Sequence, residues 1–279
     1  MAKSPNFIGI WDIDQTVRDS TEDWPAINRF ANAIYHIIGH RFGEFPEQSI
    51  LSLESATDFT VAKDLANFAL QQGWGESYYH SINFEWDKLS FEKRKTLAET
   101  IITYADLFFN KYKRAGLSFE MPGARDTLDY ILHIGGVNYE CSGNSELIAS
   151  VKLEDLGLSS KFQSFLRKTP LGPIRYLSGS HGEQGSRSEI IGQTLSYASE
   201  KYGEDISDRA VYFGDRPGDV IAAKKAGIPI VFINPNIDFG SRYNRIITEY
   251  IEQNKCLHVS TLKDTKVKSF IDRLSVSTV

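Results

Sequence analysis

The sequence FIGIWDIDQT at residues 7–16 sets the architecture of this chain. Its first half is apolar apart from one glycine, and a short continuous apolar run is typical of a strand buried on both faces. The run ends at Asp12 and Asp14, so two carboxylates follow directly after the strand. A doubly buried strand indicates a parallel sheet covered by helices. Because ligands bind beyond the carboxyl ends of such strands, we expect both carboxylates in a functional site.

Strands and helices alternate along the second part of the chain. Apolar strands are predicted at residues 137–141, 162–166, 209–213 and 228–233, the last being the final core strand. Helices are predicted after Pro122-Gly123 and at residues 146–156, 187–202 and 219–226, each followed by glycine. A Gly-rich loop is predicted at residues 171–185, and the sequence suggests no role for it. The alternation favours a parallel sheet with helices on both faces.

Residues 21–118 have a different character. Helix-compatible stretches dominate, strand signals are scarce, and helices are predicted at residues 24–38, 58–72 and 91–113. Apolar residues recur at helical spacing in the last of these segments. We therefore expect an α/β core of residues 1–20 and 119–279, interrupted by a separate helical domain of residues 21–118.

Composition limits the class of protein. The chain has 279 residues, of which 41% are hydrophobic, enough for a substantial core. A net charge of −5 argues against nucleic acid as the main partner, because binding its phosphate backbone depends on a surplus of Lys and Arg. Two cysteines are too few for a disulfide framework. No signal-like run and no apolar run near the roughly 20 residues of a membrane helix are seen. We expect a soluble, cytoplasmic protein without a membrane partner, and its oligomeric state stays open.

Polar groups from three distant segments follow predicted strands. Asp12 and Asp14 follow the first strand, Ser142 and Gly143 the second, and Asp215 a later one. The carboxyl ends of parallel strands share one edge of the sheet, so these groups should meet there. A serine hydroxyl and backbone N–H groups near a helix start are also typical of an anion-binding corner.

The acidic residues at this edge indicate a bound cation. Asp12, Asp14, Asp215 and Asp219 would repel one another without a counter-charge. Carboxylate oxygens, together with water and substrate phosphate, are the ligands that Mg²⁺ prefers. A single Asp after a strand is often a turn former or a helix cap, but two pairs of them favour a metal site.

Arg187 is a candidate for anion binding. Ser186 and Glu189 form a capping-box pattern, so a helix should begin at Arg187. Arg187 lies four residues before Ile191 on the apolar stripe of this helix, and therefore faces inward. A cation in the first turn opposes the helix dipole, which a bound anion would explain. The alternative is an arginine whose head group reaches solvent.

Four motifs in order along the chain resemble those of haloacid dehalogenase superfamily phosphatases. They are DIDQT at residues 12–16 after an apolar strand, Ser142-Gly143 after the next, Arg187 at a helix start, and GDRPGD at residues 214–219. The third motif is more often Lys in that family, and Lys168 is a rival to Arg187. The resemblance implies an α/β fold, a Rossmann-like three-layer core with a parallel sheet. It also implies an α-helical cap domain at residues 21–118 that selects the substrate.

The resemblance also implies a role for each site residue. Asp12 would attack phosphorus and form an aspartyl-phosphate, and Asp14 would act as general acid and then as general base. Mg²⁺ would be held by Asp12, Asp215 and the backbone carbonyl of Asp14. The other implied roles are phosphate binding by Ser142, Gly143 and Arg187, and support of the site by Thr16 and Asp219.

The expected activity is Mg²⁺-dependent hydrolysis of a small phosphorylated metabolite. A phosphotransferase or phosphomutase on the same site stays open, as does a phosphonate hydrolase. A non-catalytic binding protein on this scaffold is the alternative from another class. A dehalogenase is disfavoured, because dehalogenase relatives lack an aspartate at the position of Asp14.

Overall fold

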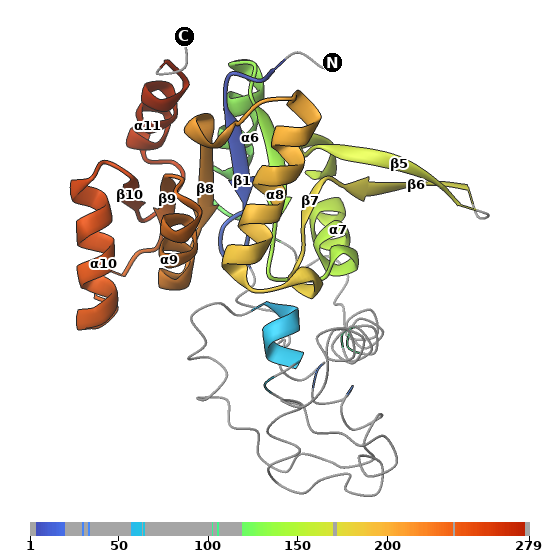
Figure 1. The fold of residues 1–279 in the computed structure, drawn as a ribbon, viewed down its shortest axis with the longest axis horizontal. Coiled ribbons are helices and arrows are strands. Elements are labelled where there is room, and N and C mark those ends of the chain that lie inside the picture. Colours follow the sequence, from blue (N-terminus) through green and yellow to red (C-terminus); the bar gives the residue numbers. More distant parts are fainter. Residues whose placement is uncertain are drawn as a thin grey trace, which may run out of the picture.

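The fold is seen in a computed structural model that describes residues 4–19, 30, 33, 57–62, 64, 102, 105, 119–169, 172–236 and 238–276. A parallel sheet of six strands forms the centre of this part of the chain (Figure 1). Its strands are β1 (Ile8–Trp11), β4 (Val137–Cys141), β7 (Gly179–Ser180), β8 (Ala210–Gly214), β9 (Ile230–Ile233) and β10 (Cys256–Val259). Their order across the sheet is β10-β9-β8-β1-β4-β7. The strand that opens the chain thus lies inside the sheet.

Helices cover both faces of this sheet. One face packs against α6 (Ala124–His133), α7 (Glu146–Asp155) and α11 (Thr265–Val276). The other face packs against α8 (Arg187–Tyr202), α9 (Pro217–Ala226) and α10 (Ser241–Glu252). Side chains of β1 alternate between the two cores: Ile8 and Ile10 join one, and Trp11 joins the other, stacked on Phe213. The predicted α/β fold, a Rossmann-like core of three layers, is confirmed.

Two short ribbons lie outside the central sheet. β2 (Arg18–Asp19) pairs antiparallel with β3 (Phe119–Glu120), where the chain leaves the core and returns to it. β5 (Ser164–Thr169) and β6 (Gly172–Leu177) form an antiparallel hairpin that projects from the core in Figure 1. Three short 3₁₀ helices complete the described core: η2 (Ser159–Lys161), η3 (Gly182–Gln184) and η4 (Ser207–Arg209).

The prediction of a loop at residues 171–185 is wrong. The segment forms β6, the edge strand β7 and η3. The prediction treats the glycines of this segment as turn formers, but here glycine allows close packing of two backbones. A Cβ on Gly179 would lie 1.8 Å from the carbonyl oxygen of Glu140 on the neighbouring strand. Close approach of two backbones, which only glycine allows, thus explains a composition that looks like a loop.

Two strand predictions also need correction. The strand predicted at residues 162–166 is β5, which pairs only with β6 and does not join the central sheet. The strand predicted as the last of the core is followed by β10, which pairs parallel with β9. β10 has two half-buried positions at the sheet edge, so its apolar signal is weaker than that of a central strand.

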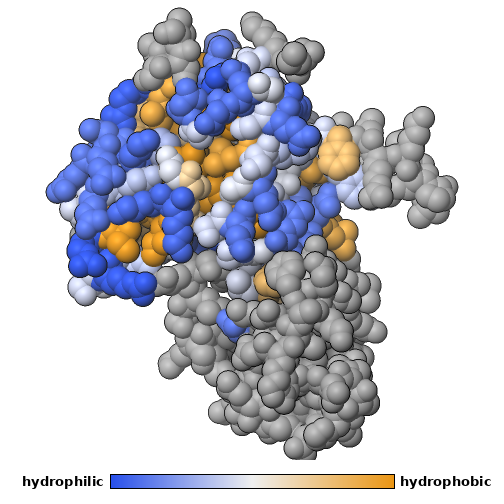
Figure 2. Space-filling view, viewed as in Figure 1, coloured by the Kyte–Doolittle hydropathy of each residue, from blue (hydrophilic) through white to orange (hydrophobic). Residues whose placement is uncertain are grey.

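The helical domain predicted at residues 21–118 lies mostly outside the described residues and stays a prediction. Phe30, residues 58–62, Ile102 and Ala105, which fall within the three predicted helices, are helical. Within the described ranges, no helix is long and apolar enough to cross a bilayer. Figure 2 shows a mostly hydrophilic outer surface over α8 and α10, with apolar side chains visible between the helices.

Candidate active site

The sheet topology brings three polar strand ends together. Trp11 on β1 is in register with Glu140 on β4 and with Phe213 on β8. Asp12 follows Trp11 directly, and its backbone N–H donates to the carbonyl of Phe213 at 2.9 Å. Ser142 and Asp215 follow β4 and β8 in the same way. Three segments more than seventy residues apart therefore meet at one sheet edge, as predicted.

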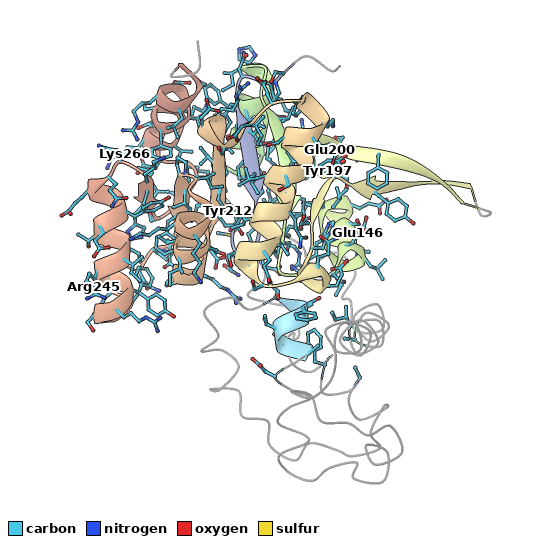
Figure 3. The ribbon with its side chains drawn as sticks, viewed as in Figure 1. Glu146, Tyr197, Glu200, Tyr212, Arg245 and Lys266 are labelled. Atoms are coloured by element: carbon cyan, nitrogen blue, oxygen red, sulfur yellow. The ribbon has the colours of Figure 1, made fainter. Side chains whose placement is uncertain are left out.

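Asp12 is held by a two-pronged contact with Arg187. Its Oδ1 lies 3.1 Å from Nη1 of Arg187, and its Oδ2 lies 3.2 Å from Nη2. Asp12 is 3% exposed and Arg187 is 4% exposed, so the pair is buried. Nη1 of Arg187 also lies 3.4 Å from the hydroxyl of Tyr212, which Figure 3 labels where β8 meets α8. Arg187 therefore faces the site and not solvent.

Arg187 also joins Asp12 to a second acid, Asp219. Its Nε lies 3.2 Å from Oδ1 of Asp219. The other oxygen of Asp219 accepts the backbone N–H groups of Asp215 and Arg216, at 3.1 and 2.9 Å. Asp219 thus holds the guanidinium of Arg187 with one oxygen and the turn after β8 with the other.

The acids at this edge fit a hard cation. One carboxylate oxygen each of Asp12, Asp215 and Asp219 lies within 4.8 Å of the others. Oδ1 of Asp215 is buried and has no hydrogen-bond partner among the described residues. Burial and the neighbouring carboxylates of Asp219 and Asp12 raise the pKa of Asp215 well above its usual value. A divalent cation with oxygen ligands would satisfy the unpartnered oxygen and offset the repulsion.

Asp14 has a different environment from Asp12. Nζ of Lys152 lies 2.7 and 2.6 Å from its two oxygens, and Nδ2 of Asn144 donates to Oδ2 at 2.9 Å. Burial acts to raise the pKa of Asp14, but the Lys152 ammonium, Asn144 and Arg18 outweigh it and lower the pKa to about 2. Asp14 is therefore ionised in this structure, and its side chain is not among the three carboxylates that could share a cation.

The loop after β4 joins both halves of the site. Nδ2 of Asn144 also donates to Oγ of Ser142, at 2.8 Å, so one amide links Ser142 to Asp14. The carbonyl of Gly143 accepts the backbone N–H of Asp58 at 2.7 Å. Oδ2 of Asp58 accepts the N–H of Ser145 at the start of α7, at 2.8 Å. A residue of the segment between β2 and β3 thus anchors the predicted phosphate loop.

The remaining predicted residues take distinct places. Thr16 is fully buried in the turn after β1, and its hydroxyl has no hydrogen-bond partner among the described residues. Lys168 lies on β5, in the projecting hairpin. The cation that contacts Asp12 is Arg187.

Sequence reasoning missed Lys152, Asn144 and Asp58. A usable signal existed for Lys152, because it shares the buried stripe of α7 with Ile148, Ala149 and Leu153. A lysine on such a stripe needs an anionic partner. No comparable signal marks Asp58, which reaches the site from far along the chain.

Comparisons with known proteins identify the family and the fold of this chain. A family model described as haloacid dehalogenase-like hydrolase matches residues 10–227. No curated protein matches the chain. Among solved structures, a family IA, variant 3 HAD hydrolase from Entamoeba histolytica is similar, with a TM-score of 0.52 and 15% identity over 96% of this chain and 99% of that one.

Two further solved structures show the same fold. A predicted phosphatase from Clostridium acetobutylicum aligns with a TM-score of 0.54 and 18% identity, over 95% of this chain and 99% of that one. A predicted phosphoglycolate phosphatase from Haemophilus somnus 129PT aligns with a TM-score of 0.52 and 15% identity, over 99% of this chain and 100% of that one. Since the family model spans most of the chain, the protein belongs to the haloacid dehalogenase-like hydrolases.

Proposed function

We propose that this hydrolase is a Mg²⁺-dependent phosphatase that cleaves a small phosphorylated metabolite through an aspartyl-phosphate on Asp12. The observation that carries the proposal is the placement of Asp12. It is buried after β1, and both of its oxygens contact Arg187. One of its oxygens lies within 4.8 Å of a carboxylate oxygen of Asp215, whose Oδ1 has no hydrogen-bond partner among the described residues. A carboxylate held between a fixed cation and a cation site suits attack on an anionic phosphate.

Two steps at Asp12 account for hydrolysis. An oxygen of Asp12 forms a bond to phosphorus while the bond from phosphorus to the leaving oxygen breaks, and Asp14 protonates that oxygen. Water then attacks phosphorus, Asp14 removes its proton, and the bond to Asp12 breaks to release phosphate. Arg187, the hydroxyl of Ser142 and the amide of Gly143 would bind the other phosphoryl oxygens.

Mg²⁺ fits the acids at the end of β8. Asp12 and Asp215 would hold it, with the backbone carbonyl of Asp14, while Asp219 keeps the turn and Arg187 in place. Bound there, the ion supplies charge compensation that lets an anionic nucleophile approach an anionic phosphate.

The contact between Lys152 and Asp14 adds a requirement to this mechanism. Asp14 is ionised here, the state that removes a proton from water in the second step. To protonate the leaving oxygen in the first step, Asp14 must first take up a proton. We therefore expect Asp14 to move away from Lys152 when substrate binds, since the ammonium favours the ionised form.

Residues 21–118 are proposed to form the cap that selects the substrate. The chain leaves and re-enters the core at the paired strands β2 and β3, close after Asp14 and Thr16. Asp58 of this segment bonds to Gly143 and Ser145 of the predicted phosphate loop. Both observations support a segment that meets the core at the active site.

Hydrolysis of p-nitrophenyl phosphate tests the proposal. The purified protein should release p-nitrophenol with Mg²⁺ and stop when EDTA is added. Asp12→Asn should abolish the activity, while the control Asp208→Asn should retain it, because Asp208 is 64% exposed and precedes β8 at the opposite sheet edge. Activity that survives both EDTA and Asp12→Asn would sink the mechanism. A panel of phosphorylated metabolites with added alcohol acceptors would then identify the substrate and separate hydrolysis from phosphoryl transfer.

A further inference from the structure

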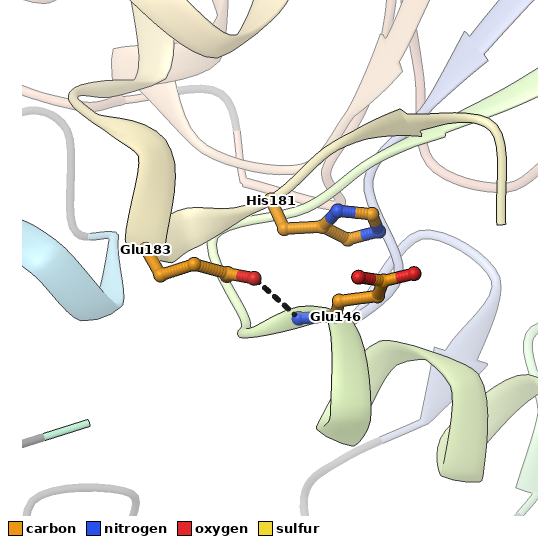
Figure 4. A group of neighbouring side chains, drawn as sticks. All are labelled: Glu146, His181 and Glu183. Atoms are coloured by element: carbon orange, nitrogen blue, oxygen red, sulfur yellow. Dashed lines mark hydrogen bonds between the residues drawn. The ribbon is translucent and has the colours of Figure 1, made fainter. Parts of the chain in front are cut away.

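A second cluster of ionisable side chains lies beside the predicted phosphate loop (Figure 4). It contains Glu146 at the start of α7, and His181 and Glu183 around η3. One ligand atom from each of these residues lies within 4.8 Å of the others. The proposed phosphatase reaction uses none of them. Their elements are separate from the acids at the ends of β1 and β8.

Glu183 is arranged to offer one oxygen to this cluster. Its Oε1 accepts the backbone N–H of Glu146 at 3.1 Å, which satisfies a free donor in the first turn of α7. Its Oε2 is buried and has no hydrogen-bond partner among the described residues. The helix contact fixes the carboxyl group and leaves the second oxygen available.

His181 is arranged in the same way. Nε2 of His181 lies 2.5 Å from Oε2 of Glu140, which is completely buried on β4. His181 is 2% exposed, and neither of its ring nitrogens has a partner with hydrogen-bond geometry in the described parts of the chain. A carboxylate close to one ring nitrogen, with no partner at the other, resembles the arrangement that orients metal-binding histidines. This buried imidazole, which is paired with Glu140 by charge but has no hydrogen bond among the described residues, is the observation that points to a ligand.

We propose that Glu146, His181 and Glu183 bind a divalent first-row transition-metal ion such as Zn²⁺. Two carboxylates and one imidazole are ligands that suit Zn²⁺, and three protein ligands plus water complete a tetrahedral site. Tetrahedral ligands at about 2.1 Å from one ion lie roughly 3.4 Å apart, so only small side-chain movements are needed. The imidazole distinguishes this site from the all-oxygen site at Asp12 and Asp215, which suits Mg²⁺.

The ion would link the segment of η3 to the phosphate loop. Glu146 directly follows the loop residues 142–145, and the backbone N–H of Gly182 already donates to the carbonyl of Asn144 at 2.7 Å. A Cβ on Gly182 would lie 1.8 Å from the carbonyl oxygen of Gly143, so the two segments are in close contact. An ion bound by both segments would hold the loop in position, a structural role separate from catalysis.

Zinc binding to the full-length, chelator-treated protein tests this site. Isothermal titration calorimetry is done in excess Mg²⁺ and in an Asp215→Asn background, so that the all-oxygen site does not contribute. We expect one Zn²⁺ per chain, with Co²⁺ giving the visible absorption of a nitrogen-ligated ion. His181→Asn and Glu183→Gln should each weaken binding more than tenfold. Glu140→Gln should weaken it by about 10- to 100-fold, as expected for a carboxylate that orients a ligand.

His133→Asn is the matched control. His133 is an exposed histidine at the end of α6, and its replacement should leave zinc binding unchanged. Circular dichroism checks that each variant is folded. If His181→Asn does not fold, Glu183→Gln takes its place in the comparison. Absence of a zinc site in the Asp215→Asn background, or equal binding by folded His181→Asn or Glu183→Gln, would overturn the proposal. Since the readout is metal binding, the result does not depend on the phosphatase activity.

Discussion

Replacing Lys152 by methionine should destabilise the protein and change the pH dependence of its activity. The ammonium of Lys152 contacts both oxygens of Asp14, and Lys152 is 5% exposed. Methionine keeps most of the buried apolar stem and removes the charge. The variant therefore isolates the electrostatic contribution of this contact.

The magnitude follows from the pKa of Asp14. The folded state lowers this pKa from 3.8 to about 2. At about 1.36 kcal/mol per pKa unit, the difference corresponds to roughly 2.5 kcal/mol at neutral pH. Because the pKa is lowered, the contribution is complete above pH 3.8 and is lost as the pH falls towards 2. Asn144 and Arg18 remain in the variant, so we expect a loss of about 2 kcal/mol.

Urea unfolding at pH 7 measures this loss directly. Lys161→Met is the control, because Lys161 pairs with Asp129 at a partly exposed site. It should lose less than about 1 kcal/mol, as is usual for a surface ion pair. Equal losses in the two variants would contradict the assignment of a strong buried contact to Lys152.

The pH profile of hydrolysis gives a second readout. Burial raises the pKa of Asp14, and Lys152 opposes this effect. Without Lys152, the pKa of Asp14 should therefore rise. The acidic limb of the profile with p-nitrophenyl phosphate should therefore move to higher pH. A profile that coincides with that of the wild type would refute the coupling of Lys152 to the proposed acid–base residue.

Three other variants test the remaining buried charges. Arg187→Met leaves Asp12 buried without its cation and should lower the free energy of unfolding by about 3–5 kcal/mol in urea; a loss below 1 kcal/mol would contradict the contact. Asp215→Asn removes like-charge repulsion, so it should raise the urea midpoint of the metal-free protein. In the wild type, Mg²⁺ at 100 times its Kd should stabilise the fold by about 2.7 kcal/mol, and this stabilisation should disappear in the variant. In chelator, wild-type stability should fall between pH 6.5 and 9 by up to about 3 kcal/mol. Burial lowers the pKa of His181, but Glu140, Glu183 and Glu146 outweigh it and raise the pKa to about 9, so this stabilisation is complete below pH 6.5. His181→Asn should flatten this slope in thermal melts at each pH, and an unchanged slope would be inconsistent with that charge.

Local patterns predicted most of the core. The apolar run at residues 7–11 became the interior strand β1, and the capping-box pattern at Ser186 placed the start of α8 correctly. Both signals act within a few residues, through burial on two faces and through the donors of a helix terminus. The meeting of Asp12, Ser142 and Asp215 was also predictable, because parallel strands share one carboxyl edge.

Local patterns failed where a residue acts across the fold. Gly179 looked like part of a loop, although it lies in an edge strand because the backbone of Glu140 leaves no room for a side chain. Lys152 and His181 had no visible partners in the sequence, and their roles depend on carboxylates that only folding brings near. Secondary structure and the sheet edge that carries the candidate site follow from local hydrophobicity and strand direction. The ionisation of Asp14 and the cluster around His181 follow from distances between segments, which no local pattern specifies.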